Sequence, residues 1–215
     1  MSEPAHGAVL PADCWQQIFG NQRPVAIEIG PGRGEFLVAS ARRAPQHNFF
    51  AIEHSASRTR EVAARLTRAG VDNARVLCGD ASCLIELLPE ACVIAFHVLF
   101  PDPWWKRRHH KRRLWTPRFV AALRRALVFD GTVELITDVG DYFAVTQAQL
   151  NADPELEVIS VGHPTEVATS FARKAVQRGA LLYRSVHRRL PARAAAPPAG
   201  RGVERVPAAA GPINR

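Results

Sequence analysis

The chain has 215 residues, of which 47% are apolar, and its formal net charge is +8. This size and apolar content suit one domain with a buried core, and the charge favours a polyanionic partner such as nucleic acid or an anionic membrane. No stretch approaches the roughly 18 apolar residues of a membrane span, and the N-terminus lacks the charged leader of a signal peptide. We therefore expect a cytoplasmic protein that does not enter a membrane.

Apolar runs alternate with amphipathic segments from residue 24 onward. In chain order we expect a strand at 24–30, a helix at 34–44, a strand at 48–54, a helix at 55–70, a strand at 74–79, a short helix at 82–88, a strand at 93–100, a helix at 116–127, a strand at 131–137, a helix at 140–150, and strands at 155–161 and 180–188. Strands that are apolar nearly throughout are typical of a parallel sheet with helices on both faces. The expected fold class is α/β, with an extension at 1–23, the domain at 24–190 and a disordered Ala/Pro/Arg-rich tail at 191–215.

Three glycines follow the first expected strand in EIGPGRGEFL (28–37). Gly30, Gly32 and Gly34 allow a tight turn and let a ligand approach the backbone closely. The dinucleotide fingerprint GxGxxG has its third glycine one residue later than here. The motif therefore indicates a cofactor turn of another kind, although an ordinary glycine turn has the same pattern.

Three acids lie within or at the ends of the expected strands. Glu53 follows the second strand, where a carboxylate can bind a ribose diol, and Asp80 follows the third, where it can contact an adenine amino group or cap the next helix. Glu28 interrupts an apolar strand, and a buried carboxylate needs a partner such as a ligand ammonium or loop N–H groups. S-adenosylmethionine offers an ammonium and a sulfonium, whereas NAD offers phosphates that this carboxylate would repel.

The stretch FPDPWWKRRHHKRR (100–113) places one acid, Asp102, beside six Lys/Arg and two His within eight residues. Asp102 follows the fourth strand, so it is expected in the same crevice as the other strand-end acids. Trp104 and Trp105 are suited to base stacking or to core packing. The basic run is expected to hold phosphates, although a solvated loop is the alternative reading.

Several segments together resemble the bacterial tRNA (guanine-N7-)-methyltransferases in order and spacing over residues 24–190. The segments are EIGPGRGEFL (28–37), FAIE (50–53), FPDPWWKRRHHKRRL (100–114), TD (137–138) and TSF (169–171). The resemblance implies a class I methyltransferase (Rossmann-like) fold with a seven-stranded, mostly parallel sheet. It also implies S-adenosyl-L-methionine as cofactor and methylation of N7 of a guanine in the tRNA variable loop.

The resemblance, with the glycine motif, assigns roles to individual residues. Asp102 is expected to be catalytic, and the cofactor-binding residues are Glu28, Gly30, Gly32, Gly34, Glu53, Asp80 and Asp102. The substrate-binding residues are Lys106, Asp138, Thr169 and Phe171. The RNA-binding residues are Arg108, His109, His110, Lys111, Arg112 and Arg113. We expect tRNA as partner, no metal, and a monomer or homodimer.

The chain departs from the family motif Thr-Lys-Phe-Glu, which here reads Thr169-Ser170-Phe171-Ala172. Three alternatives therefore stay open. An amino-group methyltransferase resembles [D/N]-P-P-[Y/F] at this strand end, but Trp104 replaces its second proline. A NAD(P)-dependent enzyme is disfavoured by the glycine spacing and Glu28. An RNA-binding protein derived from a methyltransferase, with weak or altered activity, is compatible with the changes at Ser170 and Ala172.

Overall fold

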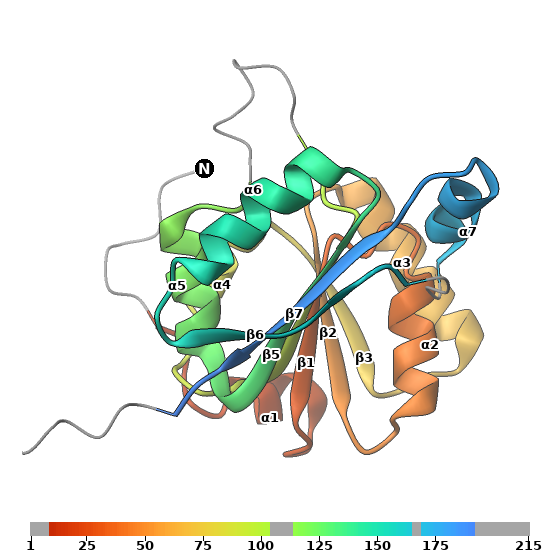
Figure 1. The fold of residues 1–215 in the computed structure, drawn as a ribbon. Coiled ribbons are helices and arrows are strands. Elements are labelled where there is room, and N and C mark those ends of the chain that lie inside the picture. The colour runs from red at the N-terminus through yellow and green to blue at the C-terminus, as the bar shows by residue number, and fades with distance from the viewer. Residues whose placement is uncertain (1–8, 104–113, 165–168, 192–215) are drawn as a thin grey trace, which may run out of the picture.

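The structure, a computed structural model, describes residues 9–103, 114–164 and 169–191, so nearly all of the tail expected at 191–215 lies outside the described residues. Figure 1 shows a central sheet with helices on both sides. The strands are β1 (Val25–Ile29), β2 (Asn48–Glu53), β3 (Ala74–Cys78), β4 (Val93–Leu99), β5 (Leu127–Thr137), β6 (Leu156–Gly162) and β7 (Tyr183–Arg189). The helices are α1 (Cys14–Phe19), α2 (Glu35–Arg43), α3 (Ala56–Ala69), α4 (Ala81–Glu86), α5 (Pro117–Ala126), α6 (Gly140–Asn151) and α7 (Ser170–Gln177).

The sheet has seven strands in the order β3-β2-β1-β4-β5-β7-β6. The first five strands of this order pair in parallel, and β7 is antiparallel to both β5 and β6. The expected α/β class with a seven-stranded, mostly parallel sheet is therefore confirmed. The chain runs outward from β1 to β3 and then returns to the other side of β1 as β4. Such a reversal leaves a crevice beyond the carboxyl ends of β1 and β4, where ligands bind in open α/β sheets.

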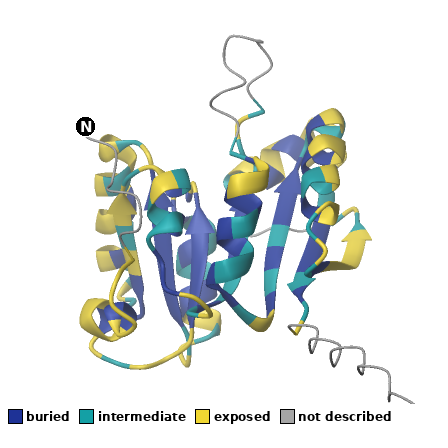
Figure 2. Ribbon diagram, turned by 90° about the vertical axis from the view of Figure 1, so that its left-hand side faces the viewer, coloured by how far each residue is buried: buried dark blue, intermediate teal, exposed yellow. Residues whose placement is uncertain are grey.

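The two faces of the sheet bury different side chains, because successive residues of a strand point to opposite faces. Ile27 and Ile29 of β1 belong to a large core with residues of α1, α4, α5 and α6. Ala26 belongs to a second core with residues of α2 and α3. Figure 2 shows the buried strands between the exposed outer faces of these helices. By this alternation Glu28 lies on the face of Ala26, toward α2.

Two predicted helix boundaries are confirmed by their hydrogen bonds. The Thr116 hydroxyl accepts a hydrogen bond from the Phe119 amide at 3.2 Å, which caps α5 at its N-terminus. The Ser55 hydroxyl accepts one from the Arg58 amide at 3.5 Å at the start of α3, and Gly70 ends that helix with φ of +64°. In the described residues, no helix has the length and apolar character needed to cross a membrane.

The structure adds features that the sequence did not indicate. β5 follows α5 without a loop and begins at Leu127, not at residue 131, because its strand continues through a bulge in which Asp130 has φ of +62°. Asp130 and Gly131 form an Asp-Gly pair, which is typical of turns, so the sequence predicts a later start of the strand. The short α1, which buries Trp15 and Phe19 within the segment 1–23, and the helix α7 were not expected either.

Gly34 is expected to tolerate alanine less well than Gly70 does. Both glycines have positive φ, where alanine costs about 1–2 kcal/mol. A Cβ at Gly34 would also lie 2.9 Å from Val62 Cγ1, whereas a Cβ at Gly70 meets open space. Urea unfolding should therefore show Gly34→Ala losing about 1–3 kcal/mol more than Gly70→Ala, with partial recovery in Gly34→Ala/Val62→Ala. Equal losses in the two single variants would contradict the steric explanation.

Candidate active site

A crevice at the carboxyl ends of β1, β2, β3 and β4 consists of two adjoining cavities of about 550 and about 620 Å³. We call them the Glu28 lobe and the Glu53 lobe, after the buried acid in the wall of each. The walls common to both lobes are Gly30, Arg58, Leu99, Phe100 and Asp102. Because they share these residues, the two cavities form one site at the point where the strand order reverses.

The glycine turn between β1 and α2 needs its glycines for backbone reasons. Gly30, Gly32 and Gly34 have φ of +69°, +55° and +71°, a region that other residues enter at a cost. The Gly30 amide donates to the Ile52 carbonyl at 2.9 Å, which ties the turn to β2. Gly30 and Gly32 line the crevice. Gly34 packs against Val62 and is not among the described lining residues, so its expected cofactor contact stays a prediction.

Glu28 is a buried acid that the protein itself leaves partly unsatisfied. It is 4% exposed and lies in the wall of its lobe. Its Oε2 atom is buried and accepts no hydrogen bond from the described residues. Burial raises the pKa of the Glu28 carboxyl to about 8. A carboxyl in this state fits a cationic ligand group, which would supply the missing partner and favour the carboxylate form.

A row of polar side chains continues from Glu28 across the sheet. His97 on β4 is paired in register with Glu28 on one side and with Glu134 of β5 on the other. The His97 Nδ1 atom lies 2.8 Å from Glu134 Oε2, and Arg184 Nε donates to Glu134 Oε1 at 2.6 Å. Burial acts to raise the pKa of Glu134, but the hydrogen bonds and charges of His97 and Arg184 outweigh it and lower that pKa. On this face of the sheet, His97 and Arg184 thus satisfy the carboxylate of Glu134, whereas Oε2 of Glu28 has no such partner among the described residues.

Glu53 and Asp80 lie in the wall of the Glu53 lobe, as expected from their places after β2 and β3. Glu53 is 5% exposed, and its Oε1 accepts a hydrogen bond from the Ser55 amide at 2.8 Å. No described residue bonds to the other oxygen of Glu53, which leaves that oxygen for a ligand. Asp80 is exposed and caps α4, because its Oδ1 accepts from the Ser82 amide at 2.8 Å and from the Ser82 hydroxyl at 2.6 Å. Asp80 therefore caps α4, as one of its two expected roles required, and it also lines the crevice.

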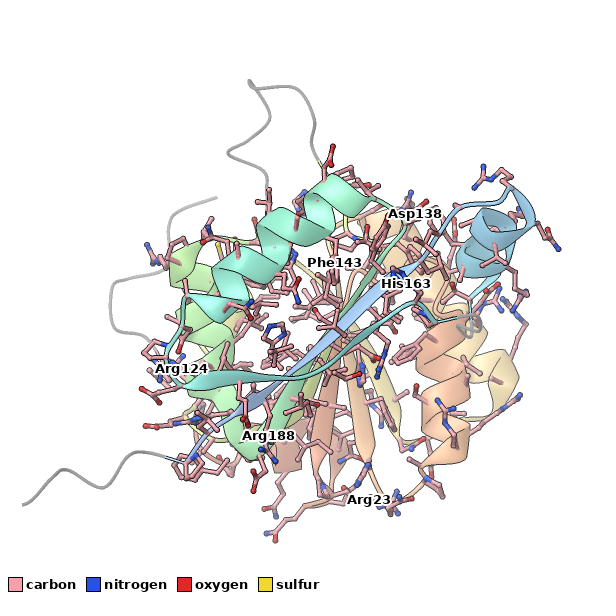
Figure 3. The ribbon with its side chains drawn as sticks, viewed as in Figure 1. Arg23, Arg124, Asp138, Phe143, His163 and Arg188 are labelled. Atoms are coloured by element: carbon pink, nitrogen blue, oxygen red, sulfur yellow. The ribbon has the colours of Figure 1, made fainter. Side chains whose placement is uncertain are left out.

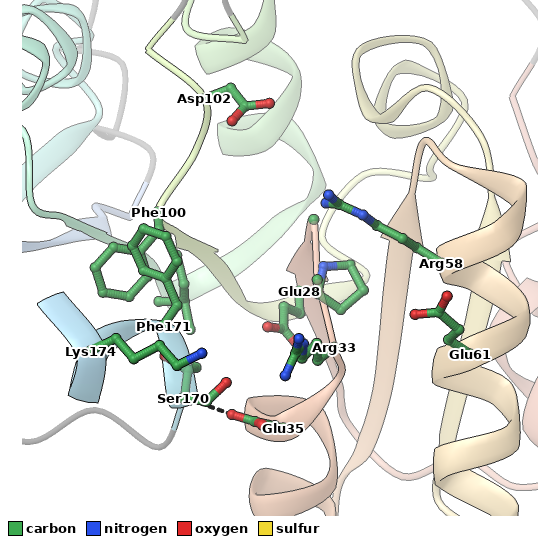
Figure 4. Close-up of a pocket in the computed structure, with 15 residues that line it drawn as sticks. Glu28, Arg33, Glu35, Arg58, Glu61, Phe100, Asp102, Ser170, Phe171 and Lys174 are labelled. Carbon is green, nitrogen blue, oxygen red and sulfur yellow. Dashed lines mark hydrogen bonds between the residues drawn. The ribbon is translucent and has the colours of Figure 1, made fainter.

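Asp102 is exposed in the wall that both lobes share (Figure 4). The chain reaches it through Phe100, which has φ of +53° although it is not glycine. The Phe100 amide donates to the Ile136 carbonyl at 2.7 Å, and its ring lies 4.7 Å from that of Phe171. These contacts hold an unfavourable backbone conformation in place just before the acid. Such local strain is characteristic of functional sites.

The start of α7 forms the other side of the Glu28 lobe. The Thr169 hydroxyl accepts a hydrogen bond from the Ala172 amide at 3.0 Å and so caps α7. Phe171 is 48% exposed beside Phe100. Thr169 and Phe171, both expected to bind substrate, therefore lie within the same crevice as Asp102.

The remaining predicted site residues are not all in the crevice. Figure 3 shows Asp138 at the end of β5, where α6 begins, and it is not among the described residues that line either lobe. Its expected substrate contact stays a prediction. Other predictions fall on residues that the structure does not describe. These are Trp104, Trp105, Lys106, Arg108, His109, His110, Lys111, Arg112 and Arg113.

Five charged residues of the Glu28 lobe were not predicted from the sequence. They are Arg33, Glu35, Arg58, Glu61 and Lys174. In Figure 4 the three cations point into the space near Glu28. The position of Arg33 inside the glycine motif was a signal that could have been used, whereas Arg58 and Lys174 look like ordinary surface residues of amphipathic helices. Within the described ranges, no group of three or more His, Cys, Asp or Glu side chains is placed to hold a metal ion.

Comparison with known proteins adds an independent finding. A family model described as "Putative methyltransferase" matches residues 22–185. A tRNA (guanine-N(7)-)-methyltransferase of Rhodopirellula baltica is 37% identical over 188 residues, covering 81% of this chain and 69% of that protein. One of the same name from Acidithiobacillus ferrooxidans is 35% identical over 183 residues, covering 82% of this chain and 81% of that protein.

Solved structures share the fold at low sequence identity. The 16S rRNA methyltransferase KamB matches with a TM-score of 0.64 and 17% identity, covering 85% of this chain and 95% of that one. A 16S rRNA (adenine(1408)-N(1))-methyltransferase variant from Catenulisporales acidiphilia, solved with its cosubstrate SAM, matches with a TM-score of 0.62 and 16% identity, covering 87% of this chain and 95% of that one. The expected Rossmann-like methyltransferase fold is therefore confirmed.

Glu28→Gln should stabilise the ligand-free protein at high pH and weaken cofactor binding. The folded-state pKa of about 8 lies above the ordinary glutamate value, so folding favours the protonated form. The resulting stability is fully present below the unfolded-state pKa of 4.5 and is lost as the pH rises from there to about 8, by up to about 1.4 kcal/mol per pH unit. Glutamine has nearly the shape of a protonated glutamate and does not ionise. Urea unfolding should show that the free energy of unfolding of the variant, relative to wild type, is larger at pH 9 than at pH 5. The same difference between the two proteins at both pH values would contradict the raised pKa of Glu28.

Proposed function

The chain belongs to the tRNA (guanine-N7-)-methyltransferase family, and from this premise we propose that it transfers a methyl group from S-adenosylmethionine to N7 of a guanine in the tRNA variable loop. The observation that carries the proposal is the crevice in which the unsatisfied Glu28 and the exposed Asp102 occur together. One acid is suited to a cofactor cation, and the other is open to a second substrate.

The residues of the two lobes can hold the two ends of the cofactor. Glu28 would accept hydrogen bonds from its ammonium group, and the open backbone at Gly30 and Gly32 would allow close approach. In the other lobe Glu53 accepts hydrogen bonds from the ribose diol, and Asp80 accepts one from the adenine amino group. When bound, S-adenosylmethionine supplies a methyl group on a positively charged sulfur.

Asp102 fits the requirements of the target base, since it stands where the two lobes meet. Guanine N7 attacks with its lone pair, so a carbon–nitrogen bond forms as the carbon–sulfur bond breaks, and no proton has to be removed. The reaction therefore needs alignment rather than a general base, and alignment is worth up to ~7–11 kcal/mol. The Asp102 carboxylate can accept hydrogen bonds from guanine N1–H and N2–H and stabilise the positive charge that develops on the purine.

The positive charge of the chain suits the tRNA partner. Arg33, Arg58 and Lys174 surround the crevice, and the net charge of the whole chain is +8. The basic run that includes Lys106 and residues 108–113 supplies further cations for phosphate contacts, which bind RNA without selecting its sequence. A reaction on tRNA places the proposed activity in the cytoplasm.

The direct test is a filter assay with purified protein, methyl-labelled S-adenosylmethionine and unmodified tRNA. The proposal predicts label in tRNA and 7-methylguanosine by mass spectrometry of the digested product. Label on an exocyclic amino group would instead support the amino-group alternative. Binding of tRNA without transfer would support an RNA-binding protein derived from a methyltransferase.

Asp102→Ala should lower the rate of methyl transfer by about 10²–10³-fold, because it removes the group that stabilises the developing charge. The affinities for tRNA and the melting temperature should stay near wild type, since Asp102 is exposed and outside the core. Asp72→Ala removes an exposed acid remote from the crevice and is the matched control. A rate near wild type in Asp102→Ala would contradict the role given to Asp102.

A further inference from the structure

Helix α7 contributes only small apolar side chains to the core, although it forms one side of the Glu28 lobe. Its buried residues, Ala172 and Ala175, pack in a separate small cluster with Leu182, against which Phe100 is partly buried. Alanine side chains bury little apolar surface, so these contacts stabilise the position of α7 only weakly. A further interaction is therefore needed to fix Phe171 and Lys174 in the crevice.

Glu35 supplies that interaction from the opposite side of the lobe. It is the first residue of α2, directly after the glycine turn, and its side chain is 20% exposed. Its Oε2 atom accepts a hydrogen bond from the Ser170 amide, which begins α7 (Figure 4). The same oxygen lies 3.8 Å from Arg173 Nη2. The contact thus joins two segments that are 135 residues apart in the sequence.

The carboxylate suits this helix end chemically. The Thr169 hydroxyl already accepts from the Ala172 amide, so the Ser170 amide needs another acceptor, which Glu35 provides. A negative charge near a helix N-terminus is also favourable. Burial acts to raise the pKa of Glu35, but the hydrogen bonds from Ser170 and the charges of Arg173 and Arg65 outweigh it and lower that pKa. Glu35 is therefore ionised at neutral pH.

We infer that Glu35 is a positioning residue that ties α7 to the cofactor-binding turn and so fixes Phe171 and Lys174 at the entrance for the target nucleotide. The identity of the target nucleotide rests on the proposed function. The link itself rests on the hydrogen bond from Ser170 and the ion pair with Arg173. The glycine turn, which would contact the cofactor, and α7, which would contact tRNA, are then held in fixed positions relative to each other. Glu35 itself has no direct role toward guanine N7 or the methyl carbon.

The link can be removed from either side. Glu35→Ala removes the acceptor, and Ser170→Pro removes the donor. Proline is favoured at the first position of a helix, and Thr169 already has the extended conformation, φ of −131° and ψ of 145°, that a residue before proline needs. Ser170→Pro therefore leaves α7 able to form. Ser170→Ala keeps the amide and loses only the hydroxyl, so it measures what the hydroxyl adds to the link, and Glu35→Gln keeps an uncharged acceptor.

Hydrogen–deuterium exchange of residues 169–177 reports on the link without any substrate. Exchange should rise most in Glu35→Ala and Ser170→Pro, and it should rise less in Ser170→Ala and in Glu35→Gln, each of which keeps part of the link. In the transfer assay, the KM for tRNA should rise about tenfold in the first two variants while affinity for S-adenosylhomocysteine is unchanged. The double variant Glu35→Ala/Ser170→Pro should be no worse than Glu35→Ala, which already removes both the hydrogen bond from Ser170 and the ion pair with Arg173.

Two results would overturn the inference. One is wild-type exchange of α7 in both Glu35→Ala and Ser170→Pro, and the other is independent, additive losses in the double variant. If Glu35→Ala does not fold, Ser170→Pro decides the question alone. A wild-type protein that transfers no methyl group to tRNA would contradict the proposed function, whereas the exchange experiment would still test the link between Glu35 and α7.

Discussion

A buried carboxyl without a full set of partners is the constraint around which the crevice is organised. Glu28 sits in the inner strand β1, on the face of the sheet that also carries Ala26 of the same strand, His97 of β4 and Glu134 of β5. Glu134 is satisfied by His97 and Arg184, but Oε2 of Glu28 has no partner in the described structure. The fold retains this unfavourable feature in the wall of the crevice, beside a glycine turn that leaves the backbone open.

The charges of the site divide between two tasks. The acids Glu28, Glu53 and Asp102 lie in the crevice walls, where they can bind the polar groups of a cofactor and a base. The cations Arg33 and Lys174 line the same crevice as Glu28 and Asp102, where they can contact phosphates of a polyanion. This arrangement suits a reaction of a polyanion whose product base is positively charged, because one crevice offers carboxylates for the base and cations for the phosphates.

Much of the site could be predicted from the sequence because strand ends meet at one edge of a parallel sheet. Glu53, Asp80 and Asp102 each follow an apolar run, and the topology alone brings them together. Likewise Glu28 could be recognised as unusual because it interrupts such a run. These predictions depend on the local pattern of contiguous residues and on the rule that the carboxyl ends of parallel strands share one edge, so they needed no knowledge of the strand order.

Other features depend on contacts between distant segments and were not predictable. Helix α7 has only alanines on its buried side, so its apolar pattern is weak, and its contact with Glu35 joins residues 135 apart. The chain has Ala172 where the family motif has glutamate, and Glu35 brings a carboxylate to the same helix end from another element. The start of β5 was missed for a different reason, since the bulge at Asp130 has the sequence of a turn.

The central claim is that Glu28 becomes the carboxylate partner of the cofactor ammonium. Its pKa of about 8 in the ligand-free protein means that it is mostly protonated at pH 6.5, so binding should release close to one proton. Calorimetric titration of S-adenosylhomocysteine at pH 6.5, in two buffers of different ionisation enthalpy, counts the protons released. The account predicts close to one proton for wild type and none for Glu28→Gln. Binding by wild type without proton release, or equal release by both proteins, would contradict it.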